Sequence, residues 1–422
     1  MTATPSIASF RRQRWTLFFV LALMYILVYF YRVSLAVVAG DISRELALTP
    51  QQLGFLAGIL FYVYALAQIP LGPMIDRLGG RLVISLCGVL TSIGGILFSQ
   101  AGTLATAVTA RALIGAGTAS VLMATLTIFS HWFGRQEFGR VSGFMVAVGN
   151  LGNLSATAPL ALAVGAIGWR SSFLAIGIVQ VLVTVLVYVM VRDRPPVAAP
   201  HDEPPHGQGE KPGMLAAWGS IFGSRDFLLL GMIAFAWYGN YLALQALWGG
   251  PYLMEVLHLS RDATGRMLMC TSLGFICGGM VIDTVARRVL RSYKKTLLAG
   301  QVLLLCLMCL FLGPAEALPH ALLGFLFFVI GLAVASGVMI YPIVRLMFPV
   351  AIVGTALTSL NFFVLMGAAS AQQVMGLIIG TFGRSATGAS PQAFHAAFLF
   401  PVGCLAVAIV LYACAGDYSD KG

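Results

Sequence analysis

The sequence is poor in charged residues. Of its 422 residues, 9% are Asp, Glu, Lys or Arg and 59% are hydrophobic, and the mean hydropathy is +0.91. Soluble domains carry about 25% charged residues, so this chain lacks the polar side chains that would cover a water-soluble surface. A membrane-spanning helix takes roughly 20 apolar residues, and the chain has enough of them for about a dozen helices. The composition therefore predicts an all-α membrane protein that crosses the bilayer many times.

The patterns that mark metal and enzyme sites are also missing. The seven cysteines all lie in apolar stretches and form neither a disulfide framework nor a zinc-type spacing. The sequence shows no nucleophile–base pair, no phosphate-binding loop and no cluster of metal ligands. We therefore expect no enzyme activity, no cofactor and no bound metal.

Apolar windows of about 19 residues predict twelve spans in two groups of six. The long polar stretch between the groups contains six prolines, so it cannot form a core. We predict an N-terminal six-helix bundle (1–191), a cytoplasmic Pro-rich linker (192–225) and a C-terminal six-helix bundle (226–422). The expected spans lie near residues 15–38, 53–73, 82–100, 104–129, 141–165, 169–191, 226–249, 262–283, 296–313, 319–342, 350–380 and 393–414.

The positions of the basic residues predict the orientation. If the N-terminus is cytoplasmic, the inner segments contain 18 of the 25 Lys and Arg residues and the outer segments contain five. Cytoplasmic loops of membrane proteins carry such an excess. Both termini are therefore expected in the cytoplasm, with the chain in the cytoplasmic (inner) membrane. The net charge of +10 then reflects topology and does not indicate a nucleic-acid partner.

The two halves share a short motif. Residues 72–81 follow the second expected span, and the related residues 279–288 follow the eighth. Their aspartates, Asp76 and Asp283, are 207 residues apart, which is close to half the chain. Two related bundles with a cavity between them at the membrane midplane are typical of secondary transporters.

The first copy of the motif, Gly72-x-x-x-Asp76-Arg77-x-Gly79-x-Arg81, resembles the signature loop of the major facilitator superfamily. A second signature of that superfamily resembles residues 111–117, with Arg111, Gly115 and Gly117. The resemblance covers the whole chain and implies twelve transmembrane helices in two pseudo-symmetric six-helix bundles. It also implies that the first loop holds one face shut and releases it during transport. The expected gating residues are Gly72, Asp76, Arg77, Gly79, Arg81, Asp283 and Arg287.

Two further segments resemble the anion:cation symporters and organophosphate:phosphate antiporters of this superfamily. Residues 29–34 (Tyr-Phe-Tyr-Arg-Val-Ser) resemble their first span, where an arginine faces the substrate, and residues 62–70 resemble their second. Two features depart from the pattern. Tyr31 stands where many relatives place an acidic residue, and the seventh span lacks the second arginine of organophosphate antiporters. These departures argue against a tightly bound phosphate dianion.

Arg32 is the main candidate for binding a ligand. An arginine near the bilayer centre costs about 2.5–3.5 kcal/mol on insertion scales, so a compensating interaction is expected. Tyr25, Tyr29 and Arg32 have i, i+4, i+7 spacing and share one helix face. Facing a cavity, two phenols and a guanidinium would bind a carboxylate or phosphate. In the alternative, Arg32 extends along the helix to the lipid headgroups.

All fifteen Asp and Glu residues lie in expected loops or near span ends. With no acidic residue at mid-membrane, an anion is the expected ligand, and a cation or cationic drug is disfavoured. For Arg111 we favour a structural or coupling role over direct contact. The polar and aromatic residues of the C-terminal half are either substrate contacts or interhelical hydrogen bonds. The expected substrate-binding residues are Arg32, Tyr25, Tyr29, Tyr62, Arg111, Trp237, Tyr241, Gln245 and Asn361.

We therefore expect a secondary active transporter that moves a small organic anion, such as a carboxylate, sugar acid or phosphate ester, by alternating access. Bringing one negative charge into an inside-negative cell costs about 2.3 kcal/mol per 100 mV. Uptake thus requires co-transported H⁺ or Na⁺, or exchange for another anion. The alternatives are an exporter of drugs or siderophores and, from a different class, a transporter-like sensor. The protein is expected to act as a monomer in the lipid bilayer.

Overall fold

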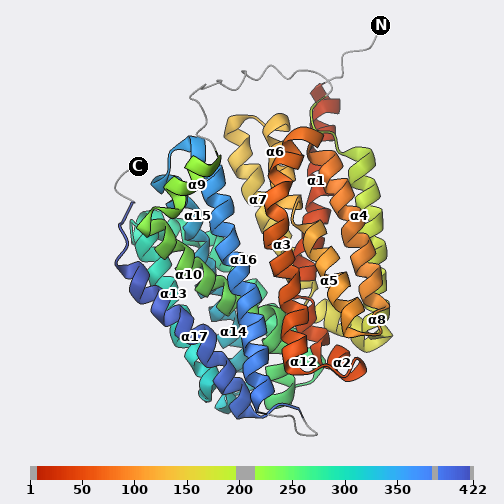
Figure 1. Ribbon diagram of the computed structural model, residues 1–422, viewed down its shortest axis with the longest axis vertical. Coiled ribbons are helices and arrows are strands. Elements are labelled where there is room, and N and C mark those ends of the chain that lie inside the picture. Colours follow the sequence, from red (N-terminus) through yellow and green to blue (C-terminus); the bar gives the residue numbers. More distant parts are fainter. Residues whose placement is uncertain (1–6, 196–213, 383–387, 419–422) are drawn as a thin grey trace. The chain divides into compact units, whose positions relative to one another are not determined.

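The computed structural model of the protein describes residues 7–195, 214–382 and 388–418, and all regular elements in this part of the chain are helices (Figure 1). The α-helices are α1 (Ile7–Val33), α2 (Leu35–Glu45), α3 (Pro50–Leu78), α4 (Gly80–Ser99), α5 (Leu104–Thr118), α6 (Val121–Trp132), α7 (Arg135–Ser155), α8 (Ala158–Met190), α9 (Met214–Phe222), α10 (Arg225–Leu242), α11 (Gly249–Pro251), α12 (Arg261–Thr284), α13 (Tyr293–Cys309), α14 (His320–Ala335), α15 (Ile340–Met347), α16 (Val350–Thr381) and α17 (Pro391–Ala413). Short π-helical segments are η1 (Ala243–Trp248), η2 (Tyr252–Val256) and η3 (Val285–Val289), and short 3₁₀ segments are η4 (Leu310–Leu312), η5 (Pro314–Ala317) and η6 (Ser336–Met339).

Eleven helical stretches of the described residues are long and apolar enough to cross a membrane. One of them, residues 140–190, is 51 residues long, whereas a single crossing takes about 20. Within it, Gly168 has a φ of +78°, a conformation that glycine adopts without a steric cost. The helix is interrupted there, between the predicted fifth and sixth spans. With this break, the stretch accounts for two crossings, and the twelve predicted spans are retained.

Several predicted spans are bent or broken. The first consists of α1 and α2, which meet at Ser34, and the fourth consists of α5 and α6. The seventh runs through α10, η1, α11 and η2 to Val256, beyond its predicted end at residue 249. The π-helical segments η1 and η2 widen the helix at this point, a feature often found near functional sites. The bend at Ser34 places Arg32 in the last turn of α1.

The predicted linker is partly helical. Its prolines at residues 196–213 lie outside the described residues, but Met214–Phe222 form α9. This helix was not predicted. Its sequence, MLAAWGSIF, is apolar, and Ala217 and Ile221, one turn apart, are both buried. An apolar face of this spacing favours a helix, so the linker ends earlier than its polar composition suggested.

Contacts divide the chain into two compact units. Unit 1 comprises residues 1–32, 63–155 and 163–207, and unit 2 comprises residues 33–62, 156–162 and 208–422. This grouping differs from the predicted division into residues 1–191 and 226–422. Parts of the first, second and fifth predicted spans pack with the C-terminal half rather than with the rest of their own half.

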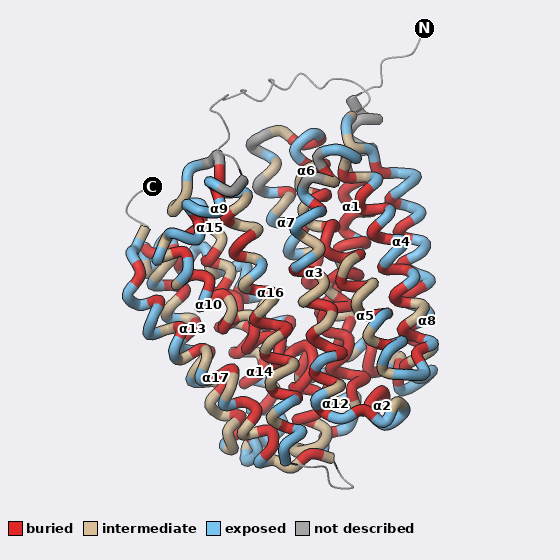
Figure 2. Tube along the Cα trace, viewed as in Figure 1, coloured by how far each residue is buried: buried red, intermediate tan, exposed pale blue. Residues whose placement is uncertain are grey.

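Large apolar side chains are exposed on the outside of both units. In unit 1, Leu182 and Val189 of α8 are 58% and 67% exposed, and in unit 2, Val410 of α17 is 67% exposed. Figure 2 shows buried and exposed residues alternating along α4 and α17. Contiguous exposed apolar surface of this kind marks a region that faces lipid or a partner, as expected for membrane-spanning helices.

In unit 1, helices α4 and α5 pack closely at Gly117, a glycine of the second signature. A side chain at Gly117 on α5 would collide with the carbonyl oxygen of Cys87 and with Thr91 on α4, so glycine lets the two backbones touch. The end of α4 is fastened to α8 by Arg170, whose guanidinium donates to the carbonyl oxygens of Ser99 and Ala101 at 2.9 and 2.7 Å. These contacts hold α4, α5 and α8 as one block beside α1.

Candidate functional site

Arg32 lies in unit 1 between two aromatic rings. Only 9% of the residue is exposed. Its guanidinium carbon lies 4.9 Å from the centre of the Tyr29 ring and 4.8 Å from the centre of the Tyr64 ring. Each such cation–π contact contributes about 0.5–2 kcal/mol, with the larger values in desolvated sites. The guanidinium is thus held inside the unit and does not extend to the lipid headgroups.

Tyr25 and Tyr29 lie side by side on α1, as predicted from their spacing. Their hydroxyl oxygens are 3.4 Å apart and their rings meet edge to face, with centres 5.0 Å apart. Two glycines of α7 make room for them. A Cβ at Gly149 would lie 2.6 Å from the Tyr25 ring, and one at Gly152 would collide with the carbonyl oxygen of Ile26. The two tyrosine rings therefore pack closely against a face of α7 that carries glycines instead of larger side chains.

Tyr64 of α3 is a site residue that was not among the predicted set. It is 2% exposed and supplies the second ring over Arg32. The sequence contained a signal, because Tyr62 and Tyr64 are two residues apart, and residues at this spacing do not share a helix face. Only one of them is able to face Arg32. The hydroxyl of Tyr62, which was predicted to bind substrate, instead donates to Oε1 of Gln373 in unit 2 at 2.8 Å.

Arg111 is more deeply buried than Arg32 and has a different type of partner. It is 1% exposed, and its Nη1 donates to the carbonyl oxygen of Tyr31 at 2.9 Å. Tyr31 is the residue directly before Arg32 in the last turn of α1. Arg111 on α5 is therefore bonded to the backbone directly before Arg32, and its structural or coupling role stays a prediction.

The polar and aromatic candidates of the C-terminal half lie in contacts between helices of unit 2. The indole of Trp237 donates to the carbonyl oxygen of Val334 at 2.8 Å. The amide nitrogen of Gln245 donates to the Leu268 carbonyl oxygen at 3.2 Å and to Oγ of Ser272 at 3.0 Å. Of the two readings left open by the sequence, the interhelical one describes these contacts.

The other two candidates of this half, Tyr241 and Asn361, lie on α10 and α16. The ring of Tyr241 stacks on that of Phe275, with centres 5.6 Å apart and an angle of 11° between the planes. Asn361 on α16 is half-buried. The stacking fixes Tyr241 against α12.

The signature loop between α3 and α4 is built around a glycine. Gly79 has a φ of +83°, and a Cβ there would lie 2.7 Å from Oδ2 of Asp193. The backbone N–H of Arg81 donates to Oδ1 of the same Asp193 at 2.8 Å, and its side chain donates to the Tyr188 carbonyl oxygen at 2.9 Å. Asp193 thus caps the N-terminus of α4, where a carboxylate is favoured by the helix dipole. This role of Asp193 was not predicted.

The remaining gating candidates are Gly72, Asp76, Arg77, Asp283 and Arg287. The side chain of Asp76 lies outside the described residues, and Arg77 is exposed. A Cβ at Gly72 would meet no atom of the described residues within 4 Å. In the second copy of the motif, Arg287 donates to Asp283 at 2.9 Å on one exposed helix turn.

Comparison with known proteins shows which family the chain belongs to. Residues 21–342 match the sequence pattern of the Major Facilitator Superfamily. The chain belongs to this superfamily. As a major facilitator protein it is a membrane transporter and not an enzyme.

Relatives of this major facilitator protein have names that refer to anions. It is 27% identical over 288 residues to the probable L-galactonate transporter of Escherichia coli, a match that covers 64% of this chain and 63% of the relative. It is 29% identical over 311 residues to the probable sulfoacetate transporter of Cupriavidus necator, which covers 71% and 69% of the two chains. The probable hexose phosphate transport protein of Chlamydia trachomatis is 22% identical over 307 residues, covering 66% of each chain.

Solved structures of the same superfamily share the fold. The bacterial homologue of the human lysosomal transporter Spinster, in an inward-facing, unoccupied conformation, superimposes with a TM-score of 0.79 at 18% identity, covering 96% of this chain and 97% of that one. The D-xylose–proton symporter gives a TM-score of 0.75 at 14% identity, covering 97% and 99%. These likenesses confirm the predicted all-α architecture.

Proposed function

We propose that this transporter carries a small organic anion, and that Arg32 binds the anionic group. The observation that supports this most strongly is the position of Arg32 in unit 1, buried between the rings of Tyr29 and Tyr64. A guanidinium binds carboxylates and phosphates through paired N–H groups and is attracted to aromatic rings at the same time. The tyrosine rings also offer apolar surface to the organic part of a ligand. The substrate class named for the three relatives is compatible with this chemistry.

The expected substrates are carboxylates, sugar acids and phosphate esters. A transported anion carries its charge against an inside-negative potential, at a cost of about 2.3 kcal/mol per 100 mV. We therefore propose that transport is coupled to H⁺ or Na⁺ or proceeds by exchange for a second anion. We also propose that the protein lies in the cytoplasmic membrane with both termini inside, because its expected inner loops carry most of the Lys and Arg residues.

A thermal-shift screen of carboxylates, sugar acids and phosphate esters on the purified protein is the first step of the test. The best stabilising compound is then used in counterflow with reconstituted vesicles. We expect Arg32→Gln to abolish counterflow, because the amide has neither the charge nor the paired donors of the guanidinium. Arg32→Lys retains the charge alone and is expected to keep a small part of the rate.

Arg266→Gln is the matched control, because Arg266 is an exposed arginine of α12 and the same charge is removed. It is expected to transport like the wild type. Normal counterflow by Arg32→Gln would contradict the proposal. A drug or siderophore exporter would instead be indicated if apolar or cationic compounds stabilised the protein and Arg32→Gln bound them equally well.

A further inference from the structure

We propose that residues 414–418, the strap, tie together the ends of three helices that are predicted to lie on the cytoplasmic side. The strap follows α17 directly and contacts the start of α10 and the start of α13. All of these residues belong to unit 2. In the alternative, the strap is a passive extension of α17 whose contacts act independently. The two interpretations differ in how the loss of one contact affects the end of α17.

The contact with α10 is made by Asp226, in the first turn of that helix. Oδ2 of Asp226 accepts from the backbone N–H of Gly416 at 3.0 Å and from the hydroxyl of Tyr418 at 2.8 Å. Burial and the Asp226 carboxylate raise the pKa of Tyr418 to about 12, so this hydroxyl remains a donor at neutral pH. Hydrogen bonds to a charged acceptor are stronger than neutral ones. Asp226 therefore holds the strap at two points.

The contact with α13 involves both the side chains and the backbone of the segment after α17. Ser292 is the N-cap of α13, and its hydroxyl donates to Oδ2 of Asp417 at 2.6 Å. Nζ of Lys294 donates to the carbonyl oxygen of Ala413 at 2.9 Å and to that of Ala415. The last carbonyl groups of a helix have no partner within the helix. Lys294 supplies donors for carbonyl groups at the end of α17, and Ser292 binds the strap beyond it.

The charges in these contacts match the dipoles of the three helices. The N-terminus of a helix attracts negative charge and the C-terminus attracts positive charge. Asp226 and Asp417 place carboxylates at the starts of α10 and α13, and Lys294 places an ammonium group at the end of α17. Since α10 also carries Tyr241, the strap fixes one end of a helix that contains an expected substrate-binding residue.

The strap is testable by limited proteolysis of the purified full chain in detergent. Tyr412 lies in the last turn of α17 and is 1% exposed. Chymotrypsin prefers large apolar and aromatic residues, and cleavage after Tyr412 requires both this turn and the strap to open. Its rate therefore reports the population of the open state. The product is identified by the mass of the shortened chain. The assay needs no substrate, so its result is independent of the anion proposal.

Loss of either contact is expected to speed cleavage after Tyr412. Asp226→Ala removes a charged acceptor, and a change of about tenfold is expected. Asp417→Ala removes the contact with α13 and is expected to have an effect of similar size. Tyr418→Phe removes one hydroxyl and is expected to speed cleavage about two- to fivefold. Adding it to Asp226→Ala is expected to change nothing further, because the acceptor is already absent.

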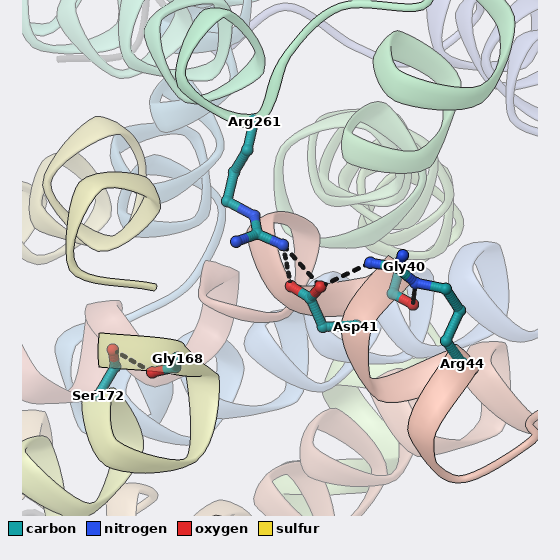
Figure 3. Close-up of polar contacts among 6 residues, drawn as sticks. All are labelled: Gly40, Asp41, Arg44, Gly168, Ser172 and Arg261. Atoms are coloured by element: carbon teal, nitrogen blue, oxygen red, sulfur yellow. Dashed lines mark hydrogen bonds and ion pairs between the residues drawn. The ribbon is translucent and has the colours of Figure 1, made fainter. Parts of the chain in front are cut away.

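Asp262→Ala on α12 is the matched control. Both helices begin with the sequence Ser-Arg-Asp, so Asp262 has the same position in the first turn as Asp226. On α12 it is the arginine that makes a long-range contact, because Nη2 of Arg261 contacts both carboxylate oxygens of Asp41 at 2.6 and 2.5 Å (Figure 3). Asp262 itself is exposed. Its substitution removes the same interaction with the helix dipole but no strap contact, and cleavage at the wild-type rate is expected.

Cleavage at the wild-type rate in either Asp226→Ala or Asp417→Ala would overturn the strap, because the contacts would then act independently. Equal acceleration by Asp262→Ala would also overturn it, since a general loss of stability would explain the result. If Asp226→Ala does not fold, Tyr418→Phe replaces it, because this variant loses a single hydroxyl. A wild-type rate in Tyr418→Phe would then contradict the proposal.

Discussion

The surroundings of Arg32 and of Arg111 differ, although both arginines are buried in unit 1. The guanidinium carbon of Arg32 lies over two tyrosine rings, whereas Nη1 of Arg111 donates to the backbone of α1. A buried arginine is therefore not by itself a sign of a ligand site. Aromatic neighbours are compatible with binding an organic anion, while a hydrogen bond to a helix backbone indicates a supporting role.

Two polar candidates of unit 2 resemble Arg111, because they donate hydrogen bonds to backbone carbonyl oxygens. In unit 2, the amide of Gln245 and the indole of Trp237 donate to carbonyl oxygens of neighbouring helices. Polar groups in lipid are often satisfied in this way. The charge that we propose to bind the substrate belongs to the N-terminal half, and these two residues of the C-terminal half make contacts between helices.

Among the variants that test this comparison, the largest loss of stability is expected from a substitution of Arg111. Arg111→Met removes a charged donor of similar length, and loss of a hydrogen bond to a charged group costs about 1.5–3 kcal/mol. Thermal unfolding in detergent is expected to shift to a lower temperature, with or without ligand. Arg32→Gln also loses its two cation–π contacts, so ligand affinity separates the two variants: Arg32→Gln is expected to lose it and Arg111→Met to retain it. If Arg111→Met kept its stability and lost only ligand binding, Arg111 would belong to the binding site.

A smaller effect is expected at Tyr64, where the ring matters more than the hydroxyl. Tyr64→Ala removes one cation–π contact, which corresponds to about 0.5–2 kcal/mol or roughly two- to thirtyfold in affinity. Tyr64→Phe keeps the ring and is expected to bind within about twofold of the wild type. Isothermal titration of both variants measures the difference. Equal losses in the two variants would show that the hydroxyl, and not the ring, supports Arg32.

The smallest effect is expected at Gln245. Gln245→Met retains the shape but loses the hydrogen bonds to Leu268 and Ser272. Interhelical hydrogen bonds in membranes contribute about 0.6 kcal/mol on average, so thermal unfolding is expected to shift slightly and affinity to stay unchanged. A large loss of affinity at normal stability would return Gln245 to the substrate site.

Much of the fold could be predicted from the sequence, because the length of an apolar stretch and the charge of a loop are properties of short sequence segments. The twelve spans, the break at Gly168 and the pairing of Tyr25 with Tyr29 follow from such signals. The bend at Ser34 did not, since no proline or glycine marks it. The choice between Tyr62 and Tyr64 depends on how α3 is rotated, which only packing decides.

The grouping of residues 33–62 with the C-terminal half was also beyond the sequence. It depends on contacts between segments that are far apart in the sequence, and composition does not report those. The ion pair of Asp41 and Arg261 joins residues 220 positions apart, and neither carries a local signal. The cap that Asp193 provides to α4 likewise depends on the path of the chain after α8.

The central claim is that the positive charge of Arg32 selects an anion, and one titration experiment tests it directly. The affinities of the best carboxylate ligand and of its neutral primary amide are measured by calorimetry on the wild type and on Arg32→Gln. Breaking a buried charge pair by removing one partner costs about 2–5 kcal/mol. The wild type is therefore expected to prefer the carboxylate by at least about thirtyfold, and Arg32→Gln to show no preference. An equal preference for the carboxylate in both proteins would contradict the claim.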